Sequence, residues 1–244
     1  MTYLFHLILT QPLANALVIL YNYVSFGDLG IAIIILTILI RLILYPVFYK
    51  GLKSQSMMQR IQPEIQRAQA EHKGDREKQA LVVMEIYKKN KINPFSSFGY
   101  LLIQLPILIA VSQLFYSGFG EATLNQLYSF VAAPATFNTT FLGLMDLAKP
   151  NMIIVVLTAI AQYFQSKLAL PKPKAGEAIS QSQKMGRYMV YLGPLLTLII
   201  FPRFPSALTL YWLVTSVFSI FQQILINKKL YGPHTTHGTL SAKS

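Results

Sequence analysis

Arg41 is the only charged residue between Leu29 and Tyr49, a stretch that is otherwise almost entirely apolar. Twelve uncharged residues precede it, which in a helix places it about 18 Å from the start of the stretch. An arginine at such depth in a membrane costs about 2.5–3.5 kcal/mol and usually pairs with a carboxylate. All nine acidic residues, however, lie outside the apolar stretches. The sequence therefore favours a wet, polar cavity around Arg41, and snorkelling of its side chain to the headgroups is the alternative.

Other polar side chains stand in the apolar stretches and could line the same cavity. Thr37 lies one helical turn before Arg41 and shares its face. In the last apolar stretch, residues spaced by three and four lie on one helix face. These residues are Thr209, Trp212, Ser216, Ser219 and Gln223. Glutamines occupy two further stretches, at Gln104 and Gln113 and at Gln162 and Gln165. For each of these residues the alternative is a hydrogen bond between helices, which is common in membrane bundles.

Residue types that support enzyme chemistry are scarce or badly placed. The chain has four histidines, none of them beside a serine or carboxylate in an apolar stretch, and no HExxH motif or phosphate-binding glycine loop. It has no cysteine, which excludes disulfides, thiolate metal sites and cysteine nucleophiles. The sequence therefore predicts no catalytic residue, no cofactor and no metal site. An intramembrane hydrolase is disfavoured for the same reason.

The composition indicates a membrane protein. Hydrophobic residues make up 53% of the 244 residues and charged residues only 12%, about half the charged share of a soluble domain. The mean hydropathy is +0.45. A spanning helix needs about 20 apolar residues, and five stretches with little or no charge meet or approach this length. We expect an all-α polytopic membrane protein with five transmembrane helices, near 29–49, 96–116, 150–167, 187–202 and 206–226.

The basic residues predict the orientation of these helices. The net charge is +12, from 21 basic and nine acidic residues. Ten basic residues fall in 50–91, five in 167–187 and three in the C-terminal tail, all on one side if there are five spans. Only Lys149 and Arg203 fall on the other side. The positive-inside rule then places the N-terminus outside and the C-terminus inside the cell, without any need for a nucleic-acid-binding domain.

The segments between the spans have distinct characters. Residues 50–93 are rich in helix formers and are broken at Gly74 and Asp75, which predicts a cytoplasmic helical hairpin with arms near 50–72 and 76–90, the first kinked by Pro63. Residues 117–148 are expected to form an external loop with some short helix.

Residues 3–24 are apolar but interrupted by Thr10, Gln11, Pro12, Asn15 and Asn22. We expect an amphipathic helix on the outer surface there, with a sixth span as the alternative. The expected divisions are an N-terminal segment 1–27, a core 28–230 and a disordered tail 231–244.

Three sequence runs, together with the segments around them, cover about residues 10–230. They are LTILIRLILYPVFYKGLKSQSMMQRIQPEIQ, IYKKNKINPFSSFGYLLIQLPILIAVSQLFY and FPSALTLYWLVTSVFSIFQQ. They resemble the first core helix with its hairpin arm, the return arm with the second helix, and the last helix of the YidC family of membrane protein insertases. Within this family, the chain resembles the bacterial members that lack a large extracytoplasmic domain.

The resemblance implies a non-enzymatic insertase and chaperone of the bacterial inner membrane. Its expected partners are nascent membrane proteins, membrane lipids, the Sec translocon, the ribosome and the signal-recognition receptor. It implies a groove open to the cytoplasm and to lipid, in which Arg41 and Thr37 match the family's groove arginine and threonine. Trp212, with Tyr211 beside it, matches a substrate-contacting aromatic, and Gln165, in competition with Gln162, matches a groove glutamine. The expected substrate groove comprises Arg41, Thr37, Gln165, Trp212, Tyr211, Ser216 and Ser219. A small-solute transporter or channel is the alternative function.

Overall fold

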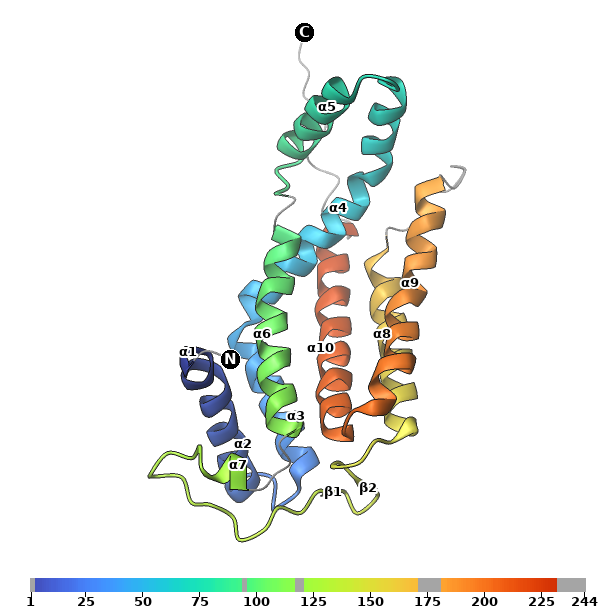
Figure 1. Cartoon of the computed structure of the whole chain (residues 1–244). Helices are drawn as coiled ribbons and strands as arrows, with labels where there is room; N and C mark the ends of the chain where they lie inside the picture. The colour runs from blue at the N-terminus through green and yellow to red at the C-terminus, as the bar shows by residue number, and fades with distance from the viewer. Residues whose placement is uncertain (1–2, 94–95, 117–120, 171–180, 232–244) are drawn as a thin grey trace.

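A computed structural model describes residues 3–93, 96–116, 121–170 and 181–231, and these are mostly helical (Figure 1). The helices are α1 (Tyr3–Phe5), a π-helical turn η1 (His6–Thr10), α2 (Gln11–Tyr23), α3 (Leu29–Ile43), α4 (Tyr45–Glu71), α5 (Arg76–Lys89), α6 (Ser96–Tyr116), α7 (Glu121–Leu124), α8 (Met152–Ala169), α9 (Gln181–Ile200), a 3-10 turn η2 (Phe201–Arg203) and α10 (Ser206–Tyr231). Two short strands, β1 (Thr140–Phe141) and β2 (Met145–Asp146), pair antiparallel. We expected a disordered tail at 231–244; Tyr231 is instead the last residue of α10, and 232–244 lie outside the described residues.

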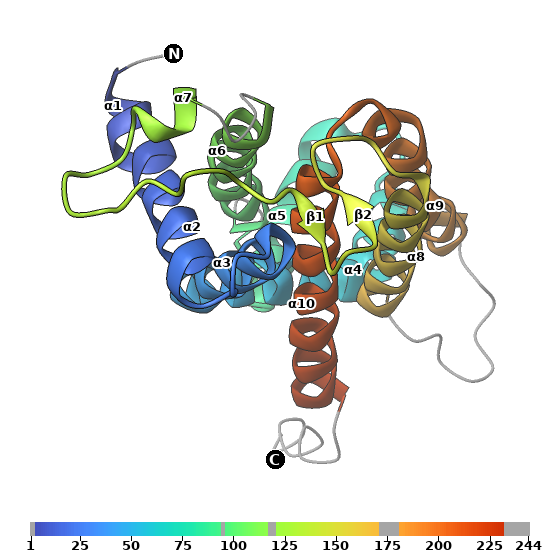
Figure 2. The ribbon, with the colours of Figure 1, turned by 90° about the horizontal axis from the view of Figure 1, so that it is seen from below.

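The long helices form a bundle with α10 near its centre (Figure 2). α10 packs on α8 on one side and on α3 on the other, while α6 lies beside the start of α4. The main apolar core lies among α2, α3, α6 and α10. Among the described residues, three helical stretches suffice by length and composition to cross a membrane: Tyr3–Tyr23, Met152–Ala169 and Ser206–Lys229. α3 and α4 together form a bent pair that also qualifies. The chain is therefore an all-α polytopic membrane protein, and the count of five spans stays a prediction.

The first predicted span ends earlier than the sequence suggested. α3 stops at Ile43, and α4 starts at Tyr45 in a direction that differs by 73°. The expected helix end near residue 49 was wrong because Pro46 stands in the first turn of α4. A proline lacks the N–H that a continuing helix needs, and it disfavours helical backbone in the residue before it. Pro63, in contrast, lies inside α4 and does not end it.

α4 and α5 form a helical hairpin at one end of the bundle (Figure 1). A small apolar cluster, separate from the main core, holds the two arms together: Ile61, Ile65, Ala68, Ile86 and Ile92. Gly74 adopts a φ of +105°, which a glycine tolerates without strain. The Asp75 carboxylate accepts a hydrogen bond from Lys78 N at 3.0 Å and caps α5. The predicted break at Gly74 and Asp75 is therefore confirmed.

The opposite end of the bundle is covered by a loop, residues 126–149, that carries β1 and β2 (Figure 1). At the start of α10, Ala207 N donates to Leu147 O and Ser206 N donates to Lys149 O, both at 3.0 Å. The loop thus satisfies the first N–H groups of this helix. Asp28 caps α3 through Ile31 N (2.9 Å) and also accepts from Leu142 N (2.7 Å). The 126–149 loop thus ties together the first turns of α3 and α10.

The polar residues that interrupt the N-terminal apolar segment also hold this loop. Asn15 donates to Gln126 O (3.0 Å) and accepts from Tyr128 N (2.7 Å). Gln11 donates to the same carbonyl at 3.1 Å, and Asn22 donates to Ala132 O at 2.8 Å. Their side chains satisfy loop backbone groups, which explains why polar residues stand in an apolar helix. Whether this helix lies on the membrane or crosses it stays a prediction.

Candidate functional site

Arg41 lies in the last turn of α3, where the bend into α4 encloses it. Its side chain is only 1% exposed. The guanidinium carbon lies 4.2 Å from the centroid of the Phe48 ring, which α4 brings back over α3 after the bend. A cation above an aromatic face is attracted by the ring's quadrupole, most strongly where water is excluded. The position of Arg41 is therefore fixed partly by an aromatic residue.

A chain of hydrogen bonds links Arg41 to two further helices. Its Nη2 donates to Gln104 Oε1 on α6 at 3.4 Å, and Gln104 Nε2 donates to the hydroxyl of Tyr211 on α10 at 3.2 Å. Thr37, one turn before Arg41, is buried and donates to Ile33 O of its own helix at 2.7 Å. We call Arg41, Phe48, Gln104 and Tyr211 the arginine cluster. It joins α3, α4, α6 and α10.

The charge of Arg41 is not compensated within the part of the chain that the structure describes. There, Arg41 makes no ion pair, and its Nη1 has no hydrogen-bond partner. Burying a charge without a counter-charge is costly, so such a group favours water or an anion. The side chains around Arg41 enclose it closely, and the hydration that the sequence predicted there stays a prediction.

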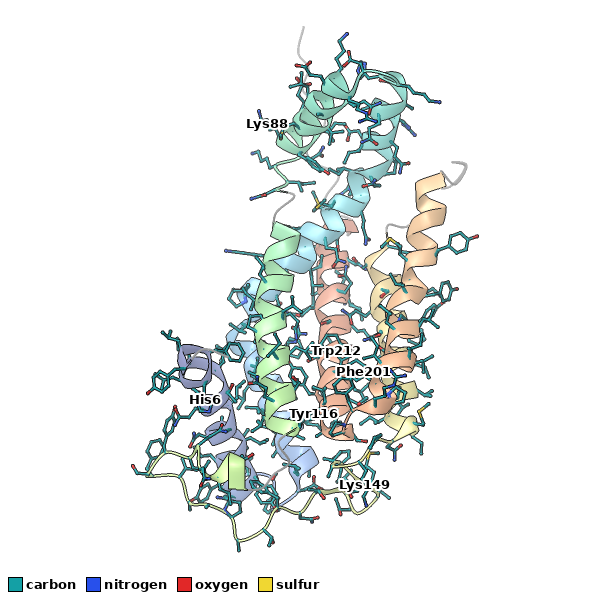
Figure 3. All side chains as sticks on the ribbon, viewed as in Figure 1. His6, Lys88, Tyr116, Lys149, Phe201 and Trp212 are labelled. Carbon is teal, nitrogen blue, oxygen red and sulfur yellow. The ribbon has the colours of Figure 1, made fainter. Side chains whose placement is uncertain are left out.

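Trp212 belongs to a second group of contacts, between α10, α8 and α9. With its amide oxygen turned toward the indole, Gln162 accepts from Trp212 Nε1. Its amide nitrogen donates to Thr197 Oγ1 at 2.7 Å and to Gly193 O at 3.0 Å. The rings of Trp212 and Phe201 lie side by side, with centroids 5.9 Å apart (Figure 3). Of the two competing glutamines, Gln162 makes this contact, while Gln165 lies half-buried nearly one turn further along α8.

The expected groove residues on α10 therefore divide between two faces. Neighbouring residues of a helix point about 100° apart, so Tyr211 joins the arginine cluster while Trp212 turns toward α8. Thr209 O accepts from Thr158 on α8 at 3.5 Å. By the same spacing, Ser216 and Ser219, both buried, lie on the side of Trp212 rather than on the side of Tyr211.

Gln223, on the same face as Trp212, contributes to packing near the base of the hairpin. Its amide donates to Ser56 Oγ on α4 and to Asn227 Oδ1, both at 2.9 Å. Asn227 in turn donates to Leu168 O at the end of α8, at 2.8 Å. On the predicted stripe of α10, Trp212 and Gln223 thus bond to neighbouring helices. Ser219 donates to Thr215 O within α10, and Thr209 Oγ1 has no partner among the described residues.

The sequence indicated Gln104 as a possible cavity residue but did not include it in the expected substrate groove, and it gave no indication of Phe48. Gln104 carried a signal, since it is a polar residue in an apolar stretch, but its partner could not be told from spacing. Phe48 carried none, because its approach to Arg41 depends on the bend that follows Ile43. Both residues reach Arg41 from other helices, which the periodicity of α3 cannot reveal.

Comparison with known proteins gives consistent matches over most of the chain. The family model described as 60Kd inner membrane protein matches residues 19–233. A protein named membrane protein insertase YidC from Fusobacterium nucleatum is 33% identical over 229 residues, which cover 94% of this chain and 99% of that protein. Proteins of the same name from Chlamydia trachomatis and Geobacter metallireducens are 30% and 31% identical over 96% and 91% of this chain. The chain spans only 30% and 37% of the length of these two relatives.

Proposed function

Since the chain belongs to the 60Kd inner membrane protein family, we propose that it is a membrane protein insertase that passes short hydrophilic tails of nascent membrane proteins through the bacterial inner membrane. Two kinds of observation support this function. A relative that carries the insertase name matches nearly end to end. The chain also buries Arg41 within its helical bundle, with Nη1 unpaired among the described residues. The uncompensated Arg41 carries the proposal, because it offers an attraction for a hydrophilic tail inside an apolar bundle.

The proposed mechanism is physical and needs neither nucleotide nor covalent chemistry. A hydrophilic tail cannot cross hydrocarbon alone, because its polar groups lose their water. The free Nη1 of Arg41 can attract the tail's carboxylates, with an interaction of about 4 kcal/mol at 4 Å and an effective dielectric of 20. The apolar helix of the substrate then moves into lipid, driven by the hydrophobic effect and, for acidic tails, by the membrane potential.

The tail is proposed to enter on the cytoplasmic side, next to the arginine cluster and Thr37. Trp212, Gln165, Ser216 and Ser219 are further candidates for the substrate path, on the side of α10 that faces α8. We assign the cytoplasm to the hairpin end, where ten basic residues lie between residues 50 and 91. That orientation puts the N-terminus outside and the C-terminus inside. The same basic end is the proposed contact for the ribosome, the signal-recognition receptor and the Sec translocon.

The test is insertion of a single-span substrate into proteoliposomes that contain the purified chain, with the tail carboxylates present or neutralised. Arg41→Lys keeps the charge and is expected to insert the acidic-tail substrate nearly as well as the wild type. Arg41→Ala and Arg41→Glu are expected to impair it, while the neutral-tail substrate is affected far less. Arg203→Ala, an exposed arginine outside the cluster, serves as the matched control.

Two results would contradict this function. Normal insertion of the acidic tail by Arg41→Ala would remove the role of the charge, and failure of Arg41→Lys would require guanidinium geometry instead. The alternative, a small-solute channel, would appear as solute flux through the same proteoliposomes without any substrate protein. The 126–149 loop, bound across the first turns of α3 and α10, favours the insertase over a channel that opens at both ends.

A further inference from the structure

Three polar side chains of α10, Thr209, Thr215 and Gln222, are buried with polar atoms that have no partner among the described residues, and two of them, Thr215 and Gln222, share one helix face. Thr215 is 4% exposed and Gln222 is 1% exposed. Within the described residues, Thr215 Oγ1 and both amide atoms of Gln222 have no hydrogen-bond partner. Buried polar groups are nearly always paired, and each exception needs an explanation. These two residues were not among the groove candidates that the sequence suggested.

Thr215 and Gln222 share a helix face with the arginine cluster. Counted at 100° per residue from Tyr211, Thr215 lies about 40° and Gln222 about 20° away around the helix. Tyr211 accepts from Gln104, so this face of α10 points toward the side of α6 and Arg41. α10 runs toward the hairpin end of the molecule (Figure 1). Gln222 therefore lies further than Thr215 along the route from the arginine cluster toward that end.

The neighbouring face of α10 differs, because its two largest polar side chains are hydrogen-bonded. On the face that carries Trp212, the indole is bound by Gln162, and the amide of Gln223 is bound by Ser56 and Asn227. Thr209 Oγ1 is the exception on that face, since it has no partner among the described residues. On the face of Tyr211, the polar side-chain atoms of Thr215 and Gln222 are unpaired among the described residues, so these two side chains do not join helices by hydrogen bonds.

We propose that Thr215 and Gln222 bind the main chain of an extended substrate tail, in continuation of the arginine cluster. A side-chain amide both donates and accepts, as a peptide group does, and a hydroxyl can do the same. From Tyr211 to Gln222 the helix rises about 16 Å, which is the length of about five residues of extended chain. Pairing with the main chain is independent of the tail's sequence. Arg41 then attracts acidic tails, whereas Thr215 and Gln222 bind the main chain of any tail.

This inference rests on the proposed insertase function, and its test uses the same proteoliposomes. Thr215→Val and Gln222→Leu, alone and together, remove the unpaired polar groups and nearly keep the side-chain volume. We expect the double variant to lower insertion several-fold for acidic and for neutral tails alike. We expect its melting temperature to stay unchanged or to rise, because replacing an unpaired buried polar group by an apolar one removes a penalty. Thr215→Ser, which keeps the hydroxyl, is expected to restore insertion relative to Thr215→Val.

Thr158→Val on α8 is the matched control, since the hydroxyl of Thr158 is buried and bonded to Ile154 O at 2.7 Å. It is expected to leave insertion unchanged and to lower the melting temperature slightly. Normal insertion by the double variant would overturn the inference. A fall in melting temperature that accompanies lost insertion would overturn it as well, because the groups would then be structural. Failure of the wild type to insert any substrate would instead refute the proposed function.

Discussion

At the scale of single residues, Arg41 shows how one charge can be held inside an apolar bundle. The ring of Phe48 lies against the guanidinium, and Gln104 Oε1 accepts a hydrogen bond from Arg41 Nη2. These contacts use only part of its hydrogen-bonding capacity, and within the described part of the chain Nη1 has no partner. The sequence alone identified Arg41, because depth and lack of a carboxylate can be read from spacing. It could not identify Phe48 or the vacant Thr215 and Gln222, because those depend on how other helices approach.

Gly30 offers a residue-scale prediction about the opposite end of α3. A Cβ added at Gly30 would overlap the ring of Phe141 in the 126–149 loop. Gly30→Ala is therefore expected to destabilise the protein by about 1–3 kcal/mol, the usual range for overpacking. Thermal unfolding in detergent measures the change.

The double variant Gly30→Ala/Phe141→Ala tests the cause of that destabilisation. Because the smaller side chain at 141 removes the overlap, the two substitutions should cost less together than the sum of their separate effects. Gly193→Ala is the control, since a Cβ there meets its nearest neighbour at an ordinary 3.6 Å. Strictly additive effects of the two substitutions would show that the ring contact does not cause the loss.

At the scale of elements, the sequence predicted the long helices well and the bends poorly. α6 and α8 lie close to the ranges expected from stretches without charge, and α5 begins directly after the predicted cap. α9 begins at Gln181, earlier than the start near 187 that we expected. The bend after Ile43 was missed because the apolar stretch continues through it to Tyr49. The pairing of β1 with β2 was missed as well, because each strand has two residues and no alternation to read.

The tip of the hairpin is expected to be dispensable for the fold. The apolar cluster that joins α4 and α5 does not include residues 71–77, most of which are exposed. Few apolar contacts hold such a segment, so its local stability is low. Replacing 71–77 by a short Gly/Ser turn should leave the protein integrated in the membrane, as measured by resistance to alkaline extraction. Loss of integration would show that the tip is a structural element.

The 126–149 loop is expected to weaken in acid because of Asp146. Hydrogen bonds from Ala148 N and Thr139, together with Lys149, hold the pKa of the Asp146 carboxyl below its ordinary value of 3.8. A lowered folded-state pKa contributes stability above the unfolded value, and that stability is lost as the pH falls through the folded pKa. Wild type should therefore melt at a higher temperature than Asp146→Asn at pH 6, with a difference that shrinks as the pH falls below about 4. A difference independent of pH would contradict the role of the charge.

At the scale of the whole molecule, charge is distributed unequally between the two ends of the bundle. The helical hairpin lies at one end and the 126–149 loop at the other (Figure 1). Ten basic residues fall in 50–91, whereas Lys149 is the only basic residue of the loop. The positive-inside rule then predicts that the hairpin is cytoplasmic and the loop external. The sequence alone led to the same orientation, because the positive-inside rule needs only the order of the spans and the positions of the basic residues.

Single cysteines test this orientation, because the chain has none of its own. Ser129→Cys and Lys73→Cys replace exposed residues at the two ends. In intact cells, an impermeant thiol reagent is expected to label residue 129, and to label residue 73 only after the membrane is permeabilised. Labelling of residue 73 but not residue 129 in intact cells would reverse the topology.

Crosslinking tests whether a substrate tail enters the bundle beside Arg41. A photo-crosslinking residue is placed at Thr37, one turn from Arg41, or at Leu157, an exposed position on α8. Ribosomes that carry a stalled single-span protein with an acidic tail are then bound to membranes containing each variant. We expect the tail to crosslink from position 37 and not from position 157. A tail that inserts normally but crosslinks from 157 as well as from 37, or from neither, would contradict it.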